Sequence, residues 1–487
     1  MEAVSMLVAV VFVVLACFMW NLVKRNISNR PPGPLELPII GHMHLIGSRS
    51  LHLLLKELSE SYGDIFSLKL GSRQSVVLGS REAIHEAFVK KAKAFAGRPD
   101  LPTFKFTRNG QTGLSLCDYS DEYVNNRKMT MKSIHHFVNN AANLNKVLGE
   151  EALKMITLFD QYVGSNKSIA PLQEFQKVIP SIFLNMMFGL TYEYNNERFQ
   201  EATKIYRKWF EVAEADNPAD FFRFLERFPN QRLQVAQECG VYFEKFILSM
   251  MDLSDSSKHC LFDEFKTVHT NSNEEKLSEP FRKSLAKVIS DIVGGGFDTA
   301  AATLAWAVLY LNQHQEVLKK CREEINSVTN DRMISPDLKS QTPYFCATVY
   351  DILRLSTVAP LGLVRKVMHD VNLSSYLIQK DTMVLANHWA ANHDPQFWEK
   401  PEALHPNHFL TESGELDTSL AREISTFSSG VRRCPGDQIG ILMLFVVLGT
   451  LIKNYDISLT QPPKDLIPLR GVTLKPKHYE ITLKLVS

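Results

Sequence analysis

The sequence predicts a mainly α-helical fold with small β-sheets, in which one large domain follows an N-terminal transmembrane helix. Two observations support this prediction. Helical periodicity covers most of the chain, and one long apolar run lies at its start. Of the 487 residues, 45% are hydrophobic and 22% are charged, a globular composition that excludes a disordered, collagen-like or coiled-coil chain. Residues 31–487 contain no repeat or linker, so we expect them to form one domain.

Charge and cysteine content exclude two further classes of protein. The chain has 54 Lys and Arg residues against 53 Asp and Glu, so it lacks the surplus of positive charge that phosphates require. We therefore expect no nucleic-acid partner. The 7 cysteines are scattered and none forms a Cys-x-x-Cys pair, which argues against a zinc cluster or a disulfide framework and favours a reducing compartment.

The apolar run extends from Met6 to Val23 and predicts an uncleaved membrane anchor within residues 1–30. At about 1.5 Å per residue it is about 27 Å long, close to the thickness of the hydrocarbon layer. Lys24, Arg25 and Arg30 follow it, so the positive-inside rule leaves the rest of the chain in the cytoplasm. A cleaved signal peptide is the alternative, but no basic residue precedes the run. Pro31-Pro32-Gly33-Pro34 then predicts a stiff spacer.

Strands are expected in three places and helices in most of the rest. Phe66 to Leu78 predicts two short strands around a Gly-Ser-Arg turn, residues 361–384 predict further short strands, and residues 472–486 predict a closing hairpin. The almost wholly apolar segment 439–452 predicts a helix that is buried on all sides. Helical periodicity predicts the other helices at 121–163, 172–189, 196–214, 231–252, 281–325 and 340–356.

The most informative segment lies just before that apolar helix and reads Phe427-Ser-Ser-Gly430-Val-Arg432-Arg433-Cys434-Pro435-Gly436. A helix N-terminus and two neighbouring arginines favour a thiolate at Cys434. The glycines allow the backbone to approach a flat ligand. A buried structural cysteine beside a surface arginine pair is the alternative interpretation.

The pattern Phe-x-x-Gly-x-Arg-x-Cys-x-Gly resembles the haem-binding loop of the cytochrome P-450 family. The resemblance implies the fold of that family, with haem b as cofactor and the Cys434 thiolate as the axial ligand of its iron. It also implies that Phe427, Gly430 and Gly436 shape the cofactor site.

A second motif, Gly294-Gly-Gly-Phe-Asp-Thr299, interrupts the long predicted helix at 281–325. Three glycines inside a helix cost about 1 kcal/mol each relative to alanine, so they require a compensating role or close helix packing. In the resembling family the matching threonine holds dioxygen and the acid relays protons. The resemblance thus implies these catalytic roles for Thr299 and Asp298, and implies that Gly295 and Gly296 make room for oxygen and substrate.

Three positions keep the spacing of the family's motifs but change one residue. Glu-x-x-Arg appears as Asp351-Ile-Leu-Arg354, the later Pro-Glu-Arg-Phe as Pro406-Asn-His408-Phe, and Trp-x-x-x-Arg as Tyr123-Val-Asn-Asn-Arg127. The resemblance places Asp351, Arg354 and His408 in a structural ion-pair network. Because histidine replaces an arginine donor only singly, we expect a looser scaffold that loses haem more readily.

The resemblance also implies that Arg127, Arg432 and Arg365 contact the haem propionates, although an ordinary surface arginine is the alternative for Arg365. Phe104, Phe106 and Phe297, with Gly295, are expected at an apolar substrate pocket; each phenylalanine is equally compatible with plain core packing. Phe221, Phe222, Phe224 and Phe228 form an aromatic cluster that suits either a membrane surface or a buried helix end.

The resemblance implies a microsomal monooxygenase similar to steroid 17-hydroxylases and to the xenobiotic-oxidising members. The chain has no dinucleotide fingerprint, so its electrons are expected from NADPH through a haemoprotein reductase, with cytochrome b5 as a further partner. Lys128, Lys132 and Arg433 are candidates for the basic docking surface, or are simply solvated charges. We expect the endoplasmic reticulum membrane as location. A reductase-independent, peroxide-rearranging relative and a haem- or sterol-binding protein without turnover remain as alternatives.

Overall fold

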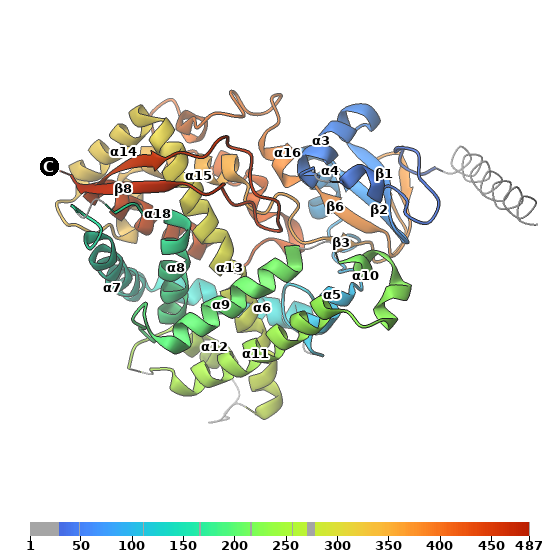
Figure 1. The fold of residues 1–487 in the computed structure, drawn as a ribbon, viewed down its shortest axis with the longest axis horizontal. Helices are drawn as coiled ribbons and strands as arrows, with labels where there is room; N and C mark the ends of the chain where they lie inside the picture. Colours follow the sequence, from blue (N-terminus) through green and yellow to red (C-terminus); the bar gives the residue numbers. More distant parts are fainter. Residues whose placement is uncertain are drawn as a thin grey trace, which may run out of the picture.

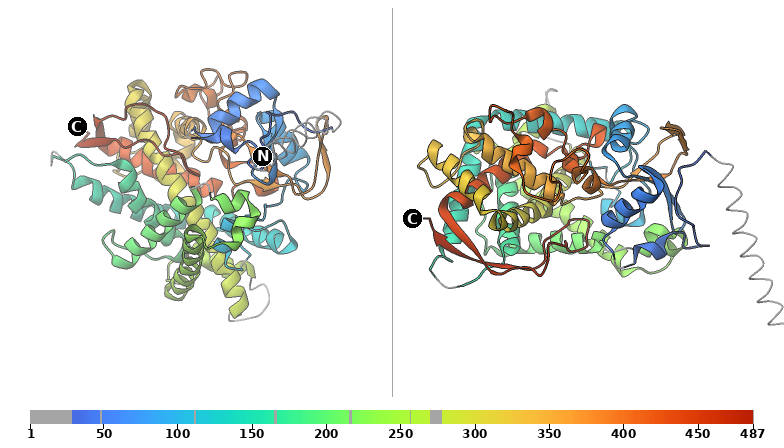
Figure 2. Two further views of the ribbon diagram at one scale, coloured as in Figure 1. Left: turned by 45° about the vertical axis from the view of Figure 1, so that its right-hand side comes forward. Right: turned by 90° about the horizontal axis from the view of Figure 1, so that it is seen from above.

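The computed structural model describes residues 29–47, 49–110, 112–164, 167–214, 217–255, 257–269 and 278–486. The predicted anchor at Met6–Val23 lies outside these residues. The described part is mainly helical with small sheets, as predicted. A four-stranded sheet lies at one end of the molecule and helices fill the rest (Figures 1 and 2).

The four-stranded sheet has the order β1-β2-β6-β3. The predicted hairpin is confirmed: β1 (Ile65–Leu70) pairs antiparallel with β2 (Arg73–Leu78). The turn between them uses Gly71 at φ +58°, a conformation that suits glycine. β6 (Met383–Ala386) joins β2 in parallel, and β3 (Arg365–Lys366) pairs antiparallel with β6. Strands from residues 361–384 thus join a sheet that begins near the N-terminus.

Two other sheets each contain two antiparallel strands. The first pairs β4 (Val371–Leu373) with β5 (Tyr376–Ile378). The second pairs β7 (Tyr455–Gln461) with β8 (Glu480–Leu485). The predicted closing hairpin within 472–486 is therefore wrong. Its alternating residues form only one strand, because β7 supplies the backbone partners and Ile169 bonds to Ile481 at the other edge.

The helices are mostly amphipathic and surround one long central helix. Their bounds are α2 Met43–Ile46, α3 Leu51–Tyr62, α4 Arg81–His85, α5 Pro102–Arg108, α6 Asp121–Asn139, α7 Ala141–Asp160, α8 Pro171–Phe188, α9 Glu197–Glu214, α10 Pro218–Phe221, α11 Gln231–Leu253, α12 Leu261–His269, α13 Glu279–Gln313, α14 Gln315–Val328, α15 Pro343–Ser356, α16 His388–Asn392, α17 Thr418–Ala421 and α18 Asp437–Asn454. Short turns are η1 Glu86–Lys90 (π-helical) and, of 3₁₀ type, η2 Arg223–Arg227, η3 Pro336–Gln341, η4 Pro406–Phe409, η5 Ser425–Phe427 and η6 Gly430–Arg432.

Two of the predicted helices are each divided by one residue. The helix expected at 121–163 breaks at Asn140, whose side chain accepts a hydrogen bond from the Asn143 amide and so caps α7. The helix expected at 281–325 breaks at His314, whose φ of −123° and ψ of 70° are not helical. The apolar periodicity continues across both breaks, so periodicity alone did not reveal them.

The interior is built around α13 and α18. α13 packs against α8, α11, α15 and α18. By length and composition, α13 and α18 are the two described helices that could cross a membrane, but most of the apolar part of each is buried inside the protein. The prediction of a buried helix at 439–452 is thus confirmed in α18. These two helices also position the candidate site, because one carries Thr299 and the other begins just after Cys434.

Candidate functional site

The segment before α18 folds into a tight loop around Cys434. The Cys434 amide donates to the Phe427 carbonyl at 2.9 Å and closes the loop. Gly430 has φ +68°, and a Cβ at this position would overlap the Phe88 carbonyl oxygen in η1. By contrast, a Cβ on Gly436 would have no heavy atom within 4 Å. The loop therefore requires glycine at 430 for its packing, whereas Gly436 leaves one side of the loop open.

The environment of Cys434 differs from the one expected from the sequence. Burial raises the pKa of the thiol, and the Gly436 amide and the charges of Arg127 and Arg433 only partly oppose this rise. Arg433 is itself neutralised, because its Nε lies 2.8 Å from the Asp437 carboxylate. A thiolate at this position therefore requires a further positive charge, such as a bound metal ion.

Buried guanidinium groups lie beside this loop. Arg432 donates to the carbonyls of Ala96, Leu114 and Cys117, and its guanidinium lies 3.7 Å from the ring centre of Tyr123. The Tyr123 hydroxyl donates to the Val431 carbonyl at 2.9 Å. Tyrosine thus holds the loop through its hydroxyl at the position where the family motif has tryptophan.

Arg365 and Arg127 approach the loop from β3 and α6. Arg365 Nη2 donates to Ser428 Oγ and to the Ser429 carbonyl, and the guanidinium lies 3.4 Å from the ring centre of Phe88. Its buried Nη1 has no hydrogen-bond partner. Arg127 Nη2 donates to the Arg433 carbonyl at 2.7 Å.

Arg98 completes this group of arginines, although none of the motifs above includes it. Arg98 donates from Nε to the Ser115 carbonyl and from Nη1 to the carbonyls of Leu363 and Val364. Burial and the neighbouring charge of Arg432 lower its pKa to about 9. The signal available in the sequence is the position of this arginine between Gly97 and Pro99, two residues that favour a turn.

The middle of α13 presents a small open region beside Thr299. The Thr299 hydroxyl donates to the Gly295 carbonyl at 2.8 Å, and a Cβ on Gly295 would meet no heavy atom within 4 Å. Gly296 has a different environment, because a Cβ there would overlap the Phe183 ring of α8. Gly295 therefore leaves space, whereas Gly296 allows close packing of two helices.

The expected pocket phenylalanines lie in two separate places. Phe297 is 1% exposed and stacks with Tyr206 at 5.6 Å between ring centres, so its ring is part of the aromatic core. Phe104 and Phe106 lie on α5 and are half-buried. Phe104 packs against the same buried cluster as Leu361 and Val364, which belong to the segment that leads to Arg365.

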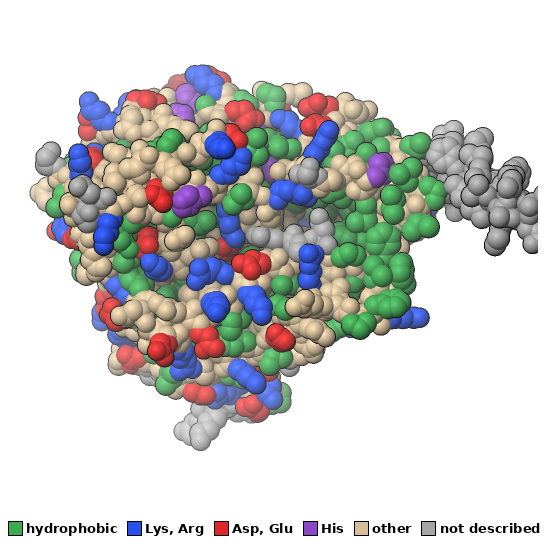
Figure 3. All heavy atoms as spheres, in the orientation of Figure 1, with side chains coloured by type: hydrophobic (Ala, Val, Ile, Leu, Met, Phe, Trp, Pro, Cys, Tyr) green, Lys and Arg blue, Asp and Glu red, His purple; other side chains and the backbone are tan. Residues whose placement is uncertain are grey.

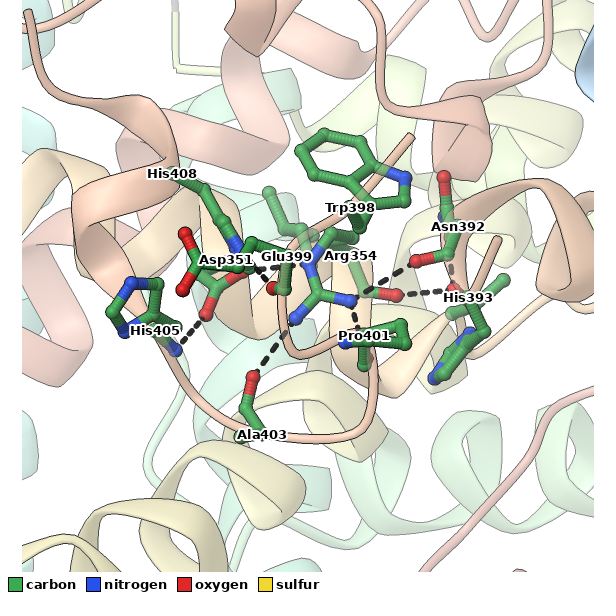
Figure 4. A network of polar contacts seen from close by, with 12 residues as sticks. Asp351, Arg354, Asn392, His393, Trp398, Glu399, Pro401, Ala403, His405 and His408 are labelled. Carbon is green, nitrogen blue, oxygen red and sulfur yellow. Dashed lines mark hydrogen bonds and ion pairs between the residues drawn. The ribbon is translucent and has the colours of Figure 1, made fainter. Parts of the chain in front are cut away.

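The expected ion-pair network is present, with Asp351 and Arg354 fully buried and the His408 side chain 6% exposed (Figure 4). Arg354 Nε lies 2.6 Å from Asp351, and its other nitrogens donate to the carbonyls of Asn392, Pro401 and Ala403. His408 Nδ1 lies 3.2 Å from the same Asp351 oxygen, and Nε2 contacts the Glu399 carbonyl. Burial raises the pKa of Asp351, but the His408 hydrogen bond and the Arg354 charge outweigh it and leave the pKa below its ordinary value.

Comparison with known proteins agrees with this geometry. The family model of cytochrome P450 matches residues 31–483. The chain belongs to the cytochrome P450 family. It is an oxidoreductase of the monooxygenase class, and the family binds haem through a cysteine thiolate.

Relatives of two kinds match nearly the whole P450 chain. Cytochrome P450 1A1 of Oryctolagus cuniculus is 27% identical over 482 residues, which cover 93% of this chain and 91% of the relative. Steroid 17-alpha-hydroxylase/17,20 lyase of Squalus acanthias is 28% identical over 496 residues, covering 99% and 97%. The human cytochrome P450 1A1 is 27% identical, covering 95% and 94%.

The arginines beside the cysteine loop fit the haem of a P450. Arg98, Arg127, Arg365 and Arg432 form no ion pair with any residue that the structure describes. Burial and the repulsion of Arg98 and Arg432 lower the pKa of Arg365 far below its usual range. Such a cluster requires an anion. The two propionates of a bound haem would supply that negative charge, and Arg365 Nη1, which has no hydrogen-bond partner among the described residues, would offer a donor for one of them.

Proposed function

We propose that this P450 inserts one atom of dioxygen into an apolar small molecule of the steroid or xenobiotic class, with Cys434 as the axial ligand of haem iron. The observation that carries the proposal is the group of arginines beside the Cys434 loop, in which Arg98, Arg365 and Arg432 are buried, Arg127 is half-buried, and none has an acidic partner among the described residues. When bound, haem supplies the activation of dioxygen. Electrons come from NADPH through a reductase.

The chain's own residues have separate tasks in this proposal. Arg98, Arg127, Arg365 and Arg432 hold the propionates and so fix the orientation of the ring. The Phe427 carbonyl and Gly430 fix the loop that presents the Cys434 sulfur. In α13 Gly295 would leave room for dioxygen, the Thr299 hydroxyl lies next to that room, and Asp298 would resupply protons.

An absorption spectrum tests the ligation and the cofactor together. We expect the dithionite-reduced protein with carbon monoxide to show a strongly red-shifted Soret band, and Cys434→His to lose this shift while retaining haem. A wild-type band at shorter wavelength would contradict thiolate ligation. Absence of haem would instead favour a binding protein without turnover.

The substrate class rests on the relatives and on the aromatic residues of α5. One relative is named a steroid hydroxylase, and Phe104 and Phe106 offer half-buried aromatic rings near the segment of Leu361 and Val364. Steroids and polycyclic aromatics are the first compounds to screen, by the change in Soret absorption on binding. Product formation that requires NADPH, reductase and dioxygen then separates a monooxygenase from a peroxide-rearranging relative.

The reductase is expected to dock on the face of α6 that adjoins the cysteine loop. Lys128 and Lys132 are exposed and one helical turn apart, next to Arg127, which bonds to the loop at Arg433. Charge complementarity controls mainly the rate of encounter. We expect K128E/K132E to slow reduction by the reductase while reduction by dithionite stays unchanged. Cytochrome b5 is expected to use the same face.

The location follows from residues 1–30 together with an apolar surface on the described part. Leu35, Leu37, Ile39 and Ile40 are exposed, and so are Phe224 and Phe228 of the expected aromatic cluster. The Gly71 amide donates to the Ile40 carbonyl and the Ser72 amide to the Phe221 carbonyl, so the β1–β2 turn joins the two segments. Figure 3 shows hydrophobic side chains gathered at this end of the molecule. We propose that it faces the endoplasmic reticulum membrane from the cytoplasm.

A further inference from the structure

The carboxylate of Asp298 contacts residues that lie outside the region around Thr299. It is fully buried, with Oδ1 at 3.4 Å from Gln176 Nε2 of α8 and Oδ2 at 2.9 Å from Lys475 Nζ. Among the described residues, the contact with Lys475 is the ion pair that Asp298 forms. No motif in the sequence marks Lys475 or Gln176.

Lys475 reaches Asp298 from the segment that links β7 and β8. This segment is fixed on both sides of the lysine. The Leu474 amide donates to the Val358 carbonyl, and the Leu474 carbonyl accepts from Trp306 Nε1 of α13. The backbone of Lys475 forms an isolated antiparallel β-bridge with that of Leu469. The ammonium lies 6.0 Å from the ring centre of Phe210 in α9, and the lysine side chain remains 18% exposed. Water therefore reaches the ion pair on the lysine side, while the carboxylate itself is sealed.

A buried carboxylate without compensation is strongly unfavourable. After Asp298 gives up a proton toward the Thr299 side, a negative charge remains on a buried carboxylate. The ammonium at 2.9 Å stabilises that charge, and the partly exposed lysine side of the pair is the side from which a proton can return. Proton transfer from an acid becomes easier when its conjugate base is stabilised.

We propose that Lys475 is a positioning residue for proton delivery, which holds the Asp298 carboxylate in place and stabilises it after each proton transfer. This inference rests on the proposed monooxygenase function. One proton leaves the Asp298 carboxyl group and one returns to it from water, so the residue is unchanged after each cycle. The electrons for dioxygen come from the reductase, as above.

Comparison of Lys475→Met with Lys475→Arg and Lys477→Met tests the proposal. Lys477 lies two residues after Lys475 in the same segment and pairs with the exposed Asp465. Loss of its ammonium is therefore the matched control. In Lys475→Met we expect product formed per NADPH to fall about tenfold, less than the roughly 10²–10⁴-fold that a positioned proton donor supplies. Peroxide release and the solvent deuterium isotope effect should both rise. Lys475→Arg should restore coupling, and Lys477→Met should match the wild type.

A second measurement does not depend on turnover. Lys475→Met leaves a buried carboxylate unpaired, so it should lower the thermal midpoint, and Asp298→Asn should recover part of this loss in the double variant. If the changes in thermal midpoint of the two single variants add up to that of the double variant, Lys475 and Asp298 do not interact, and the ion pair would be overturned. Wild-type coupling and isotope effect in Lys475→Met would overturn its role in proton delivery. If instead the wild-type protein lacks the red-shifted spectrum or any dioxygen-dependent product, the proposed function has failed, a result distinct from both.

Discussion

At the scale of single residues, the substitutions from the family motifs are compensated by neighbouring contacts. Asp351 is one methylene shorter than glutamate, yet it reaches Arg354, His408 and the His405 amide. Both ring nitrogens of His408 face acceptors, a carboxylate and a carbonyl. Only the doubly protonated imidazolium donates from both nitrogens. The network therefore keeps its contacts around Asp351, with fewer donors than the arginine of the family motif would supply.

The buried carboxylate of Asp351 predicts a loss of haem retention in acid. The lowered pKa of Asp351 contributes stability at pH values above the unfolded-state pKa of about 3.9, and this contribution is lost as the pH falls through the folded-state pKa. Transfer of haem to apomyoglobin should therefore become faster in acid. His408→Arg should slow this transfer at neutral pH, because arginine offers more donors to Asp351 than histidine does. A variant that loses haem as fast as the wild type would contradict a looser network at His408.

Thr299 carries the second prediction at this scale. Its hydroxyl donates to Gly295 next to the open region of α13. Thr299→Ala should divert reducing equivalents to peroxide while binding of an apolar ligand, measured from the Soret change, stays near the wild-type affinity. Thr299→Ser keeps the hydroxyl and should retain coupling. Equal coupling in all three proteins would remove Thr299 from proton delivery.

At the scale of elements, the cysteine loop is determined by contacts between segments far apart in the sequence. Phe88 of η1 lies against Gly430, Arg365 of β3 binds Ser429, and Arg127 of α6 binds Arg433. The cysteine loop therefore depends on the sheet at one end and on helix α6. The contact with Phe88 explains why only glycine fits at position 430, because any Cβ there would overlap the Phe88 carbonyl oxygen.

Two glycines of this loop give a matched pair of variants. Gly430→Ala places a Cβ on the Phe88 carbonyl oxygen at a φ of +68°, so the loop must shift. Strain at such a position costs about 1–3 kcal/mol, and we expect little haem-containing protein. Gly436→Ala meets open space and should bind haem almost normally. The ratio of Soret to protein absorbance measures both, and equal ratios would show that the loop is not constrained at Gly430.

At the scale of the whole molecule, the apolar surface lies at the end that follows the proline spacer. The Ser67 amide and hydroxyl bond to the carbonyls of Pro32 and Pro31, so the spacer runs along β1. An anchor in residues 1–30 would thus leave the molecule beside Leu37, Ile39 and Phe224. The anchor and the apolar surface are thereby expected to reach the same membrane.

Membrane binding without the anchor tests this arrangement. A protein that starts at residue 30 should still sediment with vesicles of neutral phospholipid, because exposed apolar side chains each contribute about 1.5–3 kcal/mol when buried. Ile39→Asp with Phe224→Asp should abolish sedimentation. Leu253→Asp with Leu153→Asp changes exposed leucines on other helices and serves as the control. Loss of binding in the control would mean that binding is not local to this surface.

Much of the candidate site was predictable because it consists of short motifs. The cysteine loop, the threonine of α13 and the spacing of Asp351 and Arg354 each lie within a few residues, and local spacing is visible in a sequence. Periodicity also predicted most helices correctly. It did not show the breaks at Asn140 and His314, since a single non-helical residue leaves the apolar pattern intact.

The sequence by itself determined the mainly helical class, the cysteine loop and the family, because each depends on local pattern. Only the tertiary structure decided which distant groups meet: Arg98 with the other arginines, β7 with β8, and Lys475 with Asp298. Those contacts join segments separated by long stretches of chain. Burial and charge then select the partners there, because a charged group without water is stable only next to a compensating one.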